Sequence, residues 1–333
     1  MSHSHSTTAT AQAIQVETHG GPEVMKLVST QLGEIPAGHA RVRHTAIGVN
    51  YIDTYHRSGL YPVPTPHGIG GEACGVVESV GEGVDASWVG RRVAYALGAP
   101  GSYSSHRDVL ATRLVPVPDA ISDEVAATAM IKGMTAWYLL KRVWPLQAGD
   151  TILVHAAAGG MGLYLTQWAT HLGLRVLGTA GSAVKAALAK EAGAAEVILY
   201  REEDFAARVR ELTDGEGVTA VLDGVGHDTF YGSLKSLKPR GILVTFGNAS
   251  GQTPEFSAAE LAPLGSLYVT RPSLFHYIAD DAELQTAAQD VFEMLESGVL
   301  HGGVHLSLPL AEAAEVHRRL EARETTGASV LIP

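Results

Sequence analysis

The chain has 333 residues, with 24 Lys and Arg against 35 Asp and Glu, so its formal net charge is −11. Hydrophobic residues make up 46% of it and charged residues 18%, a globular mixture that excludes a disordered chain and suggests about two domains. The acidic balance argues against broad binding to nucleic acid or to an anionic membrane surface.

The sequence carries no sign of an oxidising compartment or of a membrane span. Its single cysteine, Cys74, excludes an intrachain disulfide, and the apolar, strand-like surroundings of this residue predict a buried, unreactive thiol. No apolar stretch reaches the ~18 residues of a spanning helix, and the N-terminus lacks the apolar run of a secretory signal. We therefore expect a cytoplasmic protein in which residues 1–12 form a disordered polar tail, rather than a metal site at His3 and His5.

Short strand-like runs separated by Gly and Pro dominate the first third of the chain, and they predict an all-β barrel or sandwich. A change of pattern follows, because Ser122 is suited to be the N-cap of a helix. The expected strands cover residues 41–47, 75–80, 91–95 and, marked by two prolines, 111–118.

From Asp150 onward, apolar strands alternate with helices, a pattern that predicts a parallel, doubly wound sheet. The expected strands are 151–157, 174–179, 196–200, 218–222, 241–246 and 266–270. The expected helices between them are 161–172, 183–192, 203–212 and 228–237.

The alternation stops near residue 271, and a long amphipathic helix over 281–297, a strand at 304–308, a helix at 310–322 and a strand at 328–332 follow. The simplest topology returns this tail to the first domain. We therefore predict a β-rich domain over 1–125, an inserted nucleotide-binding domain over 126–271, and a return to the β-rich domain over 272–333.

The most informative segment, residues 151–162, reads as a strand, a turn of small residues and a helix. The dinucleotide fingerprint G-x-G-x-x-G appears here as Ala157, Gly159 and Gly162, with only the first glycine replaced. Small residues let a pyrophosphate approach the backbone, where the helix N-terminus favours its charge. The segment predicts dinucleotide binding through Gly159, Gly160, Met161 and Gly162.

The region after the second strand favours NADP over NAD. An NAD site usually places an acidic residue there for the ribose 2′-hydroxyl, but residues 178–182 contain none. Lys185 follows instead, and Tyr200 and Arg201 end the third strand. A 2′-phosphate is a dianion that needs cationic donors, so these residues favour NADP.

Several further motifs make the chain resemble the zinc-free medium-chain dehydrogenase/reductase proteins, and among them the NADPH:quinone oxidoreductase family related to zeta-crystallin. The resemblance runs from about residue 13 to residue 333. It rests on residues 46–55 (AIGVNYIDTY), 57–62 (RSGLYP), 155–162 (HAAAGGMG), 200–204 (YREED), 246–251 (FGNASG) and 265–272 (GSLYVTRP).

The resemblance implies an α/β fold with a GroES-like β-rich catalytic domain, an inserted Rossmann domain and the active cleft between them. It also implies NADPH as cofactor and a homodimer made by edges of the Rossmann domain. The 2′-phosphate would be surrounded by Gly181, Ser182, Lys185, Tyr200 and Arg323, and the nicotinamide side would be lined by Asn50, Tyr55, Thr135, Phe246, Gly247 and Asn248.

The chain departs from the zinc alcohol dehydrogenases of the wider superfamily at their metal ligands. Asn50 stands where those enzymes have a Cys, and Gly70, Gly71 and Glu72 replace their Gly-His-Glu. One remaining carboxylate cannot hold zinc, so we expect no zinc in this protein.

The expected activity is hydride transfer from NADPH to a quinone, with Tyr55 orienting the acceptor oxygen and Asn50 beside it. Tyr61 and Tyr103 are weaker candidates for the same role. Two alternatives remain open: an NADPH-dependent reductase of enone or alkenal double bonds, and, from another class, an NADPH-binding crystallin-like or RNA-binding protein. The scarcity of basic runs with interleaved aromatic residues weakens the second alternative.

Overall fold

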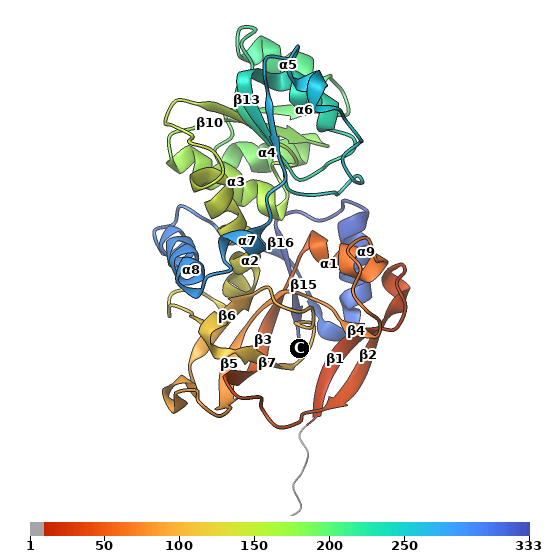
Figure 1. Ribbon diagram of the computed structural model, residues 1–333, viewed down its shortest axis with the longest axis vertical. Coiled ribbons are helices and arrows are strands. Elements are labelled where there is room, and N and C mark those ends of the chain that lie inside the picture. The colour runs from red at the N-terminus through yellow and green to blue at the C-terminus, as the bar shows by residue number, and fades with distance from the viewer. Residues whose placement is uncertain (1–9) are drawn as a thin grey trace, which may run out of the picture. The chain divides into compact units, whose positions relative to one another are not determined.

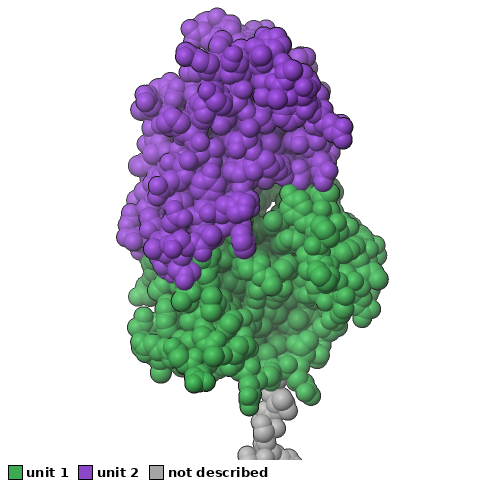
Figure 2. Space-filling model, viewed as in Figure 1, with its two compact units in different colours: residues 1–131, 302–333 green, residues 132–301 purple. Residues whose placement is uncertain are grey.

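The computed structural model describes residues 10–333, which form two compact units (Figure 2). One consists of the described residues up to Ile131 together with Gly302–Pro333, and we call it the β-rich unit. The other, Lys132–His301, is called the parallel-sheet unit. Within residues 10–333, no helix combines the length and the apolar character needed to cross a membrane.

The predicted disordered tail, residues 1–12, ends too late. Residues 1–9, with His3 and His5, lie outside the described residues. Residues 10–12 belong to strand β1 (Thr10–Val16), where they pair with the end of β2 (Met25–Gln31). A neighbouring strand satisfies their backbone groups, so the prediction is wrong for these three residues.

The parallel-sheet unit is built on six parallel strands in the order β11-β10-β9-β12-β13-β14. Numbered along the chain, this is the order of the doubly wound dinucleotide-binding fold. Residues 152–154 and 242–244 are fully buried, as expected of parallel strands covered on both faces. The strands are β9 (Thr151–Val154), β10 (Arg175–Ala180), β11 (Glu196–Leu199), β12 (Val218–Asp223), β13 (Leu237–Thr245) and β14 (Tyr268–Thr270).

Helices connect these strands (Figure 1), and side-chain caps fix where several of them begin. Ser182 accepts the backbone N–H of Lys185, and Asp204 accepts those of Ala206 and Ala207. The helices are α3 (Gly160–His171), α4 (Ala183–Glu191), α5 (Phe205–Leu212), α6 (Phe230–Ser236), the 3-10 helix η4 (Ala258–Leu261), α7 (Leu274–Tyr277) and α8 (Asp281–Glu296).

Helix α8 belongs to the parallel-sheet unit, although the sequence-based division assigns it to the returning tail. Asp290 on α8 accepts hydrogen bonds from Trp137 Nε1 at 2.8 Å and from Lys141 Nζ at 2.7 Å, both on α2 (Asp123–Lys141). The compact units divide after Ile131 and after His301, whereas the predicted domains divide after residues 125 and 271. A compact unit is not necessarily a domain that folds by itself. The predicted domain limits therefore stay a prediction.

The β-rich unit contains two sheets. The larger has the order β15-β16-β3-β5-β6-β8, with β7 paired to β3, and the smaller has the order β2-β1-β4. Strand β16 pairs with β3, so the C-terminal tail returns to the first domain as predicted. The remaining strands are β3 (His39–Val49), β4 (His67–Gly68), β5 (Glu72–Val80), β6 (Arg92–Ala96), β7 (His106–Leu110), β8 (Val115–Pro116), β15 (Val304–Pro309) and β16 (Ala328–Ile332). The helices are η1 (Pro22–Val24), α1 (Tyr51–Ser58), η2 (Ala86–Trp88), η3 (Ala111–Arg113), η5 (Leu310–Glu312) and α9 (Ala313–Glu321).

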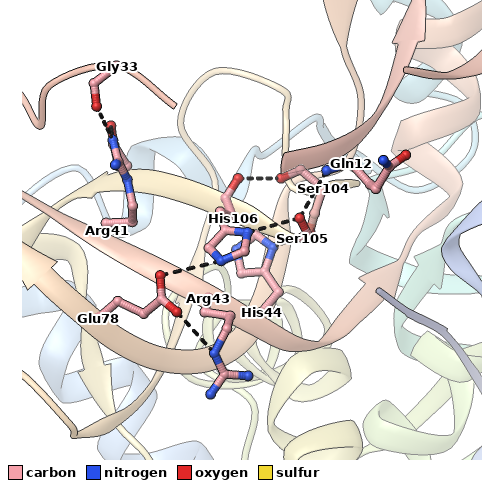
Figure 3. Close-up of polar contacts among 10 residues, drawn as sticks. Gln12, Gly33, Arg41, Arg43, His44, Glu78, Ser104, Ser105 and His106 are labelled. Carbon is pink, nitrogen blue, oxygen red and sulfur yellow. Dashed lines mark hydrogen bonds and ion pairs between the residues drawn. The ribbon is translucent and has the colours of Figure 1, made fainter. Parts of the chain in front are cut away.

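Polar contacts link strands β1, β3, β5 and β7 of the β-rich unit (Figure 3). The Gln12 N–H donates to Ser105 Oγ at 3.0 Å, and this hydroxyl is bonded to His106 Nδ1 at 2.9 Å. Glu78 lies 3.2 Å from Arg43 Nε and 3.4 Å from His106 Nε2. The Glu78 and Arg43 side chains are more than one third exposed, so their ion pair stabilises the fold only slightly. We interpret the group as surface contacts between strands and not as a reactive site.

Two expected elements differ from the structure. The predicted strand over 111–118 is wrong, because residues 111–113 form η3 and only Val115–Pro116 pair as β8. Proline lacks the N–H that a strand interior donates, which limits the pairing there. The predicted strand over 151–157 is too long: β9 ends at Val154, and Ala156 has a left-handed backbone with φ +51. The predicted cap of α2 is confirmed by the Val125 N–H, which donates to Ser122 Oγ at 3.3 Å.

Candidate functional site

The turn between β9 and α3 has the close packing that the fingerprint predicts. Gly162 is buried, and a Cβ on it would lie 2.2 Å from the carbonyl oxygen of Ala156 and 2.7 Å from the Cα of Ala157. Any side chain would push α3 away from the turn, so the third glycine of the motif is a steric requirement. The replaced first glycine causes no conflict, because the left-handed conformation falls on Ala156 and not on Ala157.

The start of α3 fits the pyrophosphate of a dinucleotide. Gly159 is its N-cap, and no described side chain accepts a hydrogen bond from the first turn there. The N–H groups of that turn therefore keep their capacity for an anionic ligand, which the helix dipole also favours. Gly159, Gly160, Met161 and Gly162 thus fit the role predicted for them, and that role stays a prediction.

Four predicted 2′-phosphate residues come together at the carboxyl ends of β10 and β11. These strands pair in parallel, with Ala180 opposite Leu199. A Cβ on Gly181 would lie 2.8 Å from the hydroxyl of Tyr200, so the phenol lies over the glycine backbone. Ser182 caps α4 by accepting the N–H of Lys185 at 3.4 Å, which places that lysine in the first turn beside them. The group combines a cation, two hydroxyls and a helix N-terminus, the donors that a phosphate dianion needs.

The loops after β12 and β13 meet at the same edge of the sheet. A Cβ on Gly247 would lie 2.3 Å from the carbonyl oxygen of Gly224, so the two backbones touch and only glycine fits. Phe246 donates its N–H to Asp223 O at 2.8 Å, and Asn248 is buried. The segment 246–248 therefore has a fixed course at the edge where doubly wound sheets bind ligands.

The sequence reasoning missed two charged residues that hold these loops. Asp223, fully buried at the end of β12, accepts the N–H groups of Val225 and Gly226 and the hydroxyl of Thr229, at 2.7, 3.1 and 2.7 Å. Arg271 donates to Gly247 O at 3.0 Å. Each of them directly follows a predicted strand, and this position in the sequence could have identified them.

His155 is also held inside this unit. Its ring is hydrogen-bonded to Thr179 Oγ1 at 3.1 Å and to Ser233 Oγ at 2.9 Å. Burial lowers the pKa of His155, so the imidazole is neutral near pH 7. We interpret it as a structural link between β9, β10 and α6.

In the β-rich unit, the side chains of Asn50 and Glu72 are hydrogen-bonded to each other. Asn50 Nδ2 donates to Glu72 Oε1 at 2.7 Å, and the other oxygen of Glu72 accepts the N–H of Ile131 at 2.6 Å. Both oxygens of this buried carboxylate are therefore in use, and the neighbouring donor is an amide instead of a thiolate or imidazole. This donor set does not fit zinc, and no group of three or more His, Cys, Asp or Glu in residues 10–333 could hold a metal ion.

The remaining predicted site residues come from three segments of the chain. Tyr55 is on α1, nearly buried, with its ring centroid 5.6 Å from that of Tyr51 and 5.1 Å from that of Tyr61. Thr135 is buried on α2, in the parallel-sheet unit. Arg323 follows α9 with a left-handed backbone, φ +60. Their cofactor contacts stay predictions.

Two weaker expectations can be judged from burial. Tyr103 is completely buried, and its hydroxyl is bonded to Asp53 and His317, so the idea that it orients an acceptor is wrong. Cys74 is buried as predicted: it lies in β5, its thiol donates to Asp123 Oδ1 at 3.7 Å, and burial raises its pKa to about 12. A thiol with this pKa is not a nucleophile near pH 7.

Known proteins match this chain over nearly its whole length. Residues 36–119 match the family of the alcohol dehydrogenase GroES-like domain, and residues 160–293 match that of the zinc-binding dehydrogenase. The quinone oxidoreductase of Pseudomonas aeruginosa is 48% identical over 97% of this chain and 100% of that protein. The 2-haloacrylate reductase of a Burkholderia species is 42% identical over 96% of this chain and 98% of that protein.

The fold has an equally extensive match among solved structures. The Escherichia coli quinone oxidoreductase complexed with NADPH has a TM-score of 0.94 and 45% identity, and the match covers 98% of this chain and 100% of that one. Similarity of this extent in both sequence and fold shows that the chain belongs to the quinone oxidoreductase family of the medium-chain dehydrogenase/reductase proteins.

Proposed function

We propose that this chain is an NADPH-dependent quinone reductase that works without zinc. The observation that carries the proposal is the group of Gly181, Ser182, Lys185 and Tyr200, whose donors suit a 2′-phosphate. It occurs in a chain that is similar from end to end to quinone oxidoreductases, one of them solved with NADPH. The fold alone would not support an activity, since this fold serves many reactions.

The proposal adopts the cofactor contacts that the sequence predicts. The turn residues Gly159, Gly160, Met161 and Gly162 would hold the pyrophosphate, and the group around Lys185 would hold the 2′-phosphate. The contacts of Asn50, Tyr55, Thr135, Phe246, Gly247, Asn248 and Arg323 rest on the resemblance to the family.

NADPH, when bound, supplies the hydride. The chain's own part is to hold the acceptor, orient its oxygen and keep water out. In this proposal the Tyr55 hydroxyl orients the acceptor oxygen, beside an Asn50 that Glu72 holds in place. A quinone accepts hydride readily because its reduction gives an aromatic product. It therefore needs no Lewis acid to activate its carbonyl group.

The experiment that tests the function is NADPH oxidation by the purified, EDTA-treated protein over quinones, enones and aldehydes, with NADH in parallel. We expect rapid turnover of quinones with NADPH and slow turnover with NADH. Turnover of enones or haloacrylates alone would move the function to double-bond reduction, which the 42% identity to a 2-haloacrylate reductase supports as the second candidate. NADPH binding without turnover of any acceptor would favour the binding-protein alternative.

Tyr55→Phe is expected to lower kcat with quinones about tenfold, which corresponds to one lost hydrogen bond to the acceptor. The dissociation constant of NADPH should stay unchanged, because the ring itself remains. Steady-state kinetics with a fluorescence titration of NADPH measures both. Tyr51→Phe is the matched control, since it removes a hydroxyl from the same helix. Unchanged turnover of Tyr55→Phe with every acceptor would remove Tyr55 from the chemistry.

The proposal includes a homodimer and a cytoplasmic location. Strand β14 supports the homodimer, because it is an edge strand of the six-stranded sheet. Tyr268 on this strand is 51% exposed and packs against Trp144, with ring centroids 5.0 Å apart. An aromatic residue exposed on a sheet edge suits pairing with a second chain. A single reduced thiol, Cys74, is consistent with a reducing compartment.

A further inference from the structure

Two buried carboxylates accept hydrogen bonds from Asn50. Its side chain donates to Glu72, and its backbone N–H donates to Asp53 Oδ2 at 2.8 Å, as part of the capping box that begins α1. Asp53 is fully buried, and the same oxygen also accepts the hydroxyl of Tyr103 at 3.0 Å. The geometry of Asn50, and of the helix that carries Tyr55, therefore depends on where Tyr103 holds Asp53.

The hydrogen bonds of Tyr103 continue to His317 and Arg57, and the donor at each step can be assigned. Its hydroxyl lies 3.0 Å from His317 Nε2, and His317 Nδ1 lies 3.1 Å from Arg57 Nη1. Arginine only donates, so Nδ1 is the acceptor and Nε2 carries the proton. His317 then donates to Tyr103, which donates to Asp53. Burial lowers the pKa of His317 to about 3, so the imidazole is neutral near pH 7 and keeps this arrangement of protons.

The far end of this chain of hydrogen bonds reaches the turn after α9. Arg57 donates to both carboxylate oxygens of Glu321, at 2.6 and 3.1 Å, and its own side chain is 2% exposed. Glu321 is the last residue of α9, and Arg323 follows two residues later. A bidentate pair of this kind fixes direction as well as distance. It therefore ties the turn of Arg323 to the helix of Tyr55.

We propose that Tyr103, His317 and Arg57 are positioning residues. Their buried hydrogen bonds fix the positions of Asn50, Tyr55 and Arg323 relative to one another, as cofactor binding requires. The inference rests on the proposed function, because it takes these three residues to face NADPH. Tyr103 itself is completely buried, and its ring packs against Gly70, where a Cβ would lie 2.2 Å from the ring.

Tyr103→Phe tests the proposal, and the chain offers a matched control in Tyr95→Phe. Tyr95 is equally buried in the same unit, and its hydroxyl is bonded to His44 at 2.9 Å and to Ser102 at 3.0 Å. Both variants are expected to lower the melting temperature. Only Tyr103→Phe should raise the dissociation constant of NADPH, by about fivefold, the equivalent of one hydrogen bond. Fluorescence titration of NADPH gives this value without any acceptor.

A second pair of variants separates positioning from folding. His317→Gln keeps an acceptor for Arg57 and a donor for Tyr103, whereas His317→Leu removes both. We expect NADPH affinity within twofold of the original protein for the first and an about fivefold loss for the second. Equal affinities in Tyr103→Phe and Tyr95→Phe, or in the two His317 variants, would overturn the proposal. Failure of the unmodified protein to reduce quinones would reject the proposed function alone, because these comparisons need only binding.

Discussion

Two buried histidines of the β-rich unit are expected to make the free energy of unfolding of the protein fall by about 4 kcal/mol between pH 7.5 and pH 5. Burial lowers the pKa of both His44 and His317 from 6.5 to about 3. In the unfolded chain these imidazoles take up protons below pH 6.5, but in the folded state they do not. The unfolded state therefore binds more protons between pH 6.5 and 3, and stability that is complete above this range is lost as the pH falls through it. Each imidazole contributes about 2 kcal/mol at pH 5.

Cys74 provides the probe for this measurement, because it is the only cysteine and is buried in the same unit. Urea-induced exposure of its thiol, normalised to labelling of the unfolded chain at each pH, reports the unfolding that exposes β5. His317→Gln should reduce this fall by about 2 kcal/mol. His227→Gln, which changes a side chain that is 62% exposed, should leave it intact. A stability that does not change between pH 7.5 and 5 would contradict the prediction.

The parallel-sheet unit could be predicted well from the sequence, because its signals are local. Continuous apolar runs such as 152–154 and 242–244 indicate buried parallel strands, and Gly162 indicates the close turn that the structure contains. Element limits depend on single residues that such patterns do not resolve. The left-handed conformation of Ala156, for example, ends β9 three residues earlier than expected.

The hydrogen bonds around Asn50 could not be predicted, because they join residues that are far apart in the chain. Tyr103 and His317 are separated by 214 residues, and Arg57 and Glu321 by 264. Only the pairing of Asn50 with Asp53, three residues apart, has the spacing of a capping box and was open to prediction. A lone histidine on the buried face of α9 gives no local indication of its partners.

The discrimination between NADPH and NADH is expected to depend on Lys185, and this can be tested by itself. Lys185→Ala is expected to weaken NADPH binding 10- to 100-fold, about 1.4 to 2.7 kcal/mol, and NADH binding by no more than about twofold. A charge-assisted hydrogen bond to the 2′-phosphate is lost for the first cofactor, and the second has no phosphate there. Fluorescence titration of both cofactors at fixed ionic strength measures the difference.

Lys190→Ala is the matched control for Lys185→Ala. It removes the same charge from the same helix, but Lys190 lies in the last turn of α4 and pairs with Glu196 at 3.3 Å. If Lys185 binds the 2′-phosphate, the Lys190 variant should bind both cofactors as the unmodified protein does.

Equal losses for NADPH and NADH in Lys185→Ala would show that this lysine stabilises the helix and does not bind the phosphate. Equal losses of NADPH in the two variants would instead indicate a general effect of net charge, which salt would screen. Selective loss of NADPH in Lys185→Ala alone would place the source of cofactor choice at the carboxyl ends of β10 and β11.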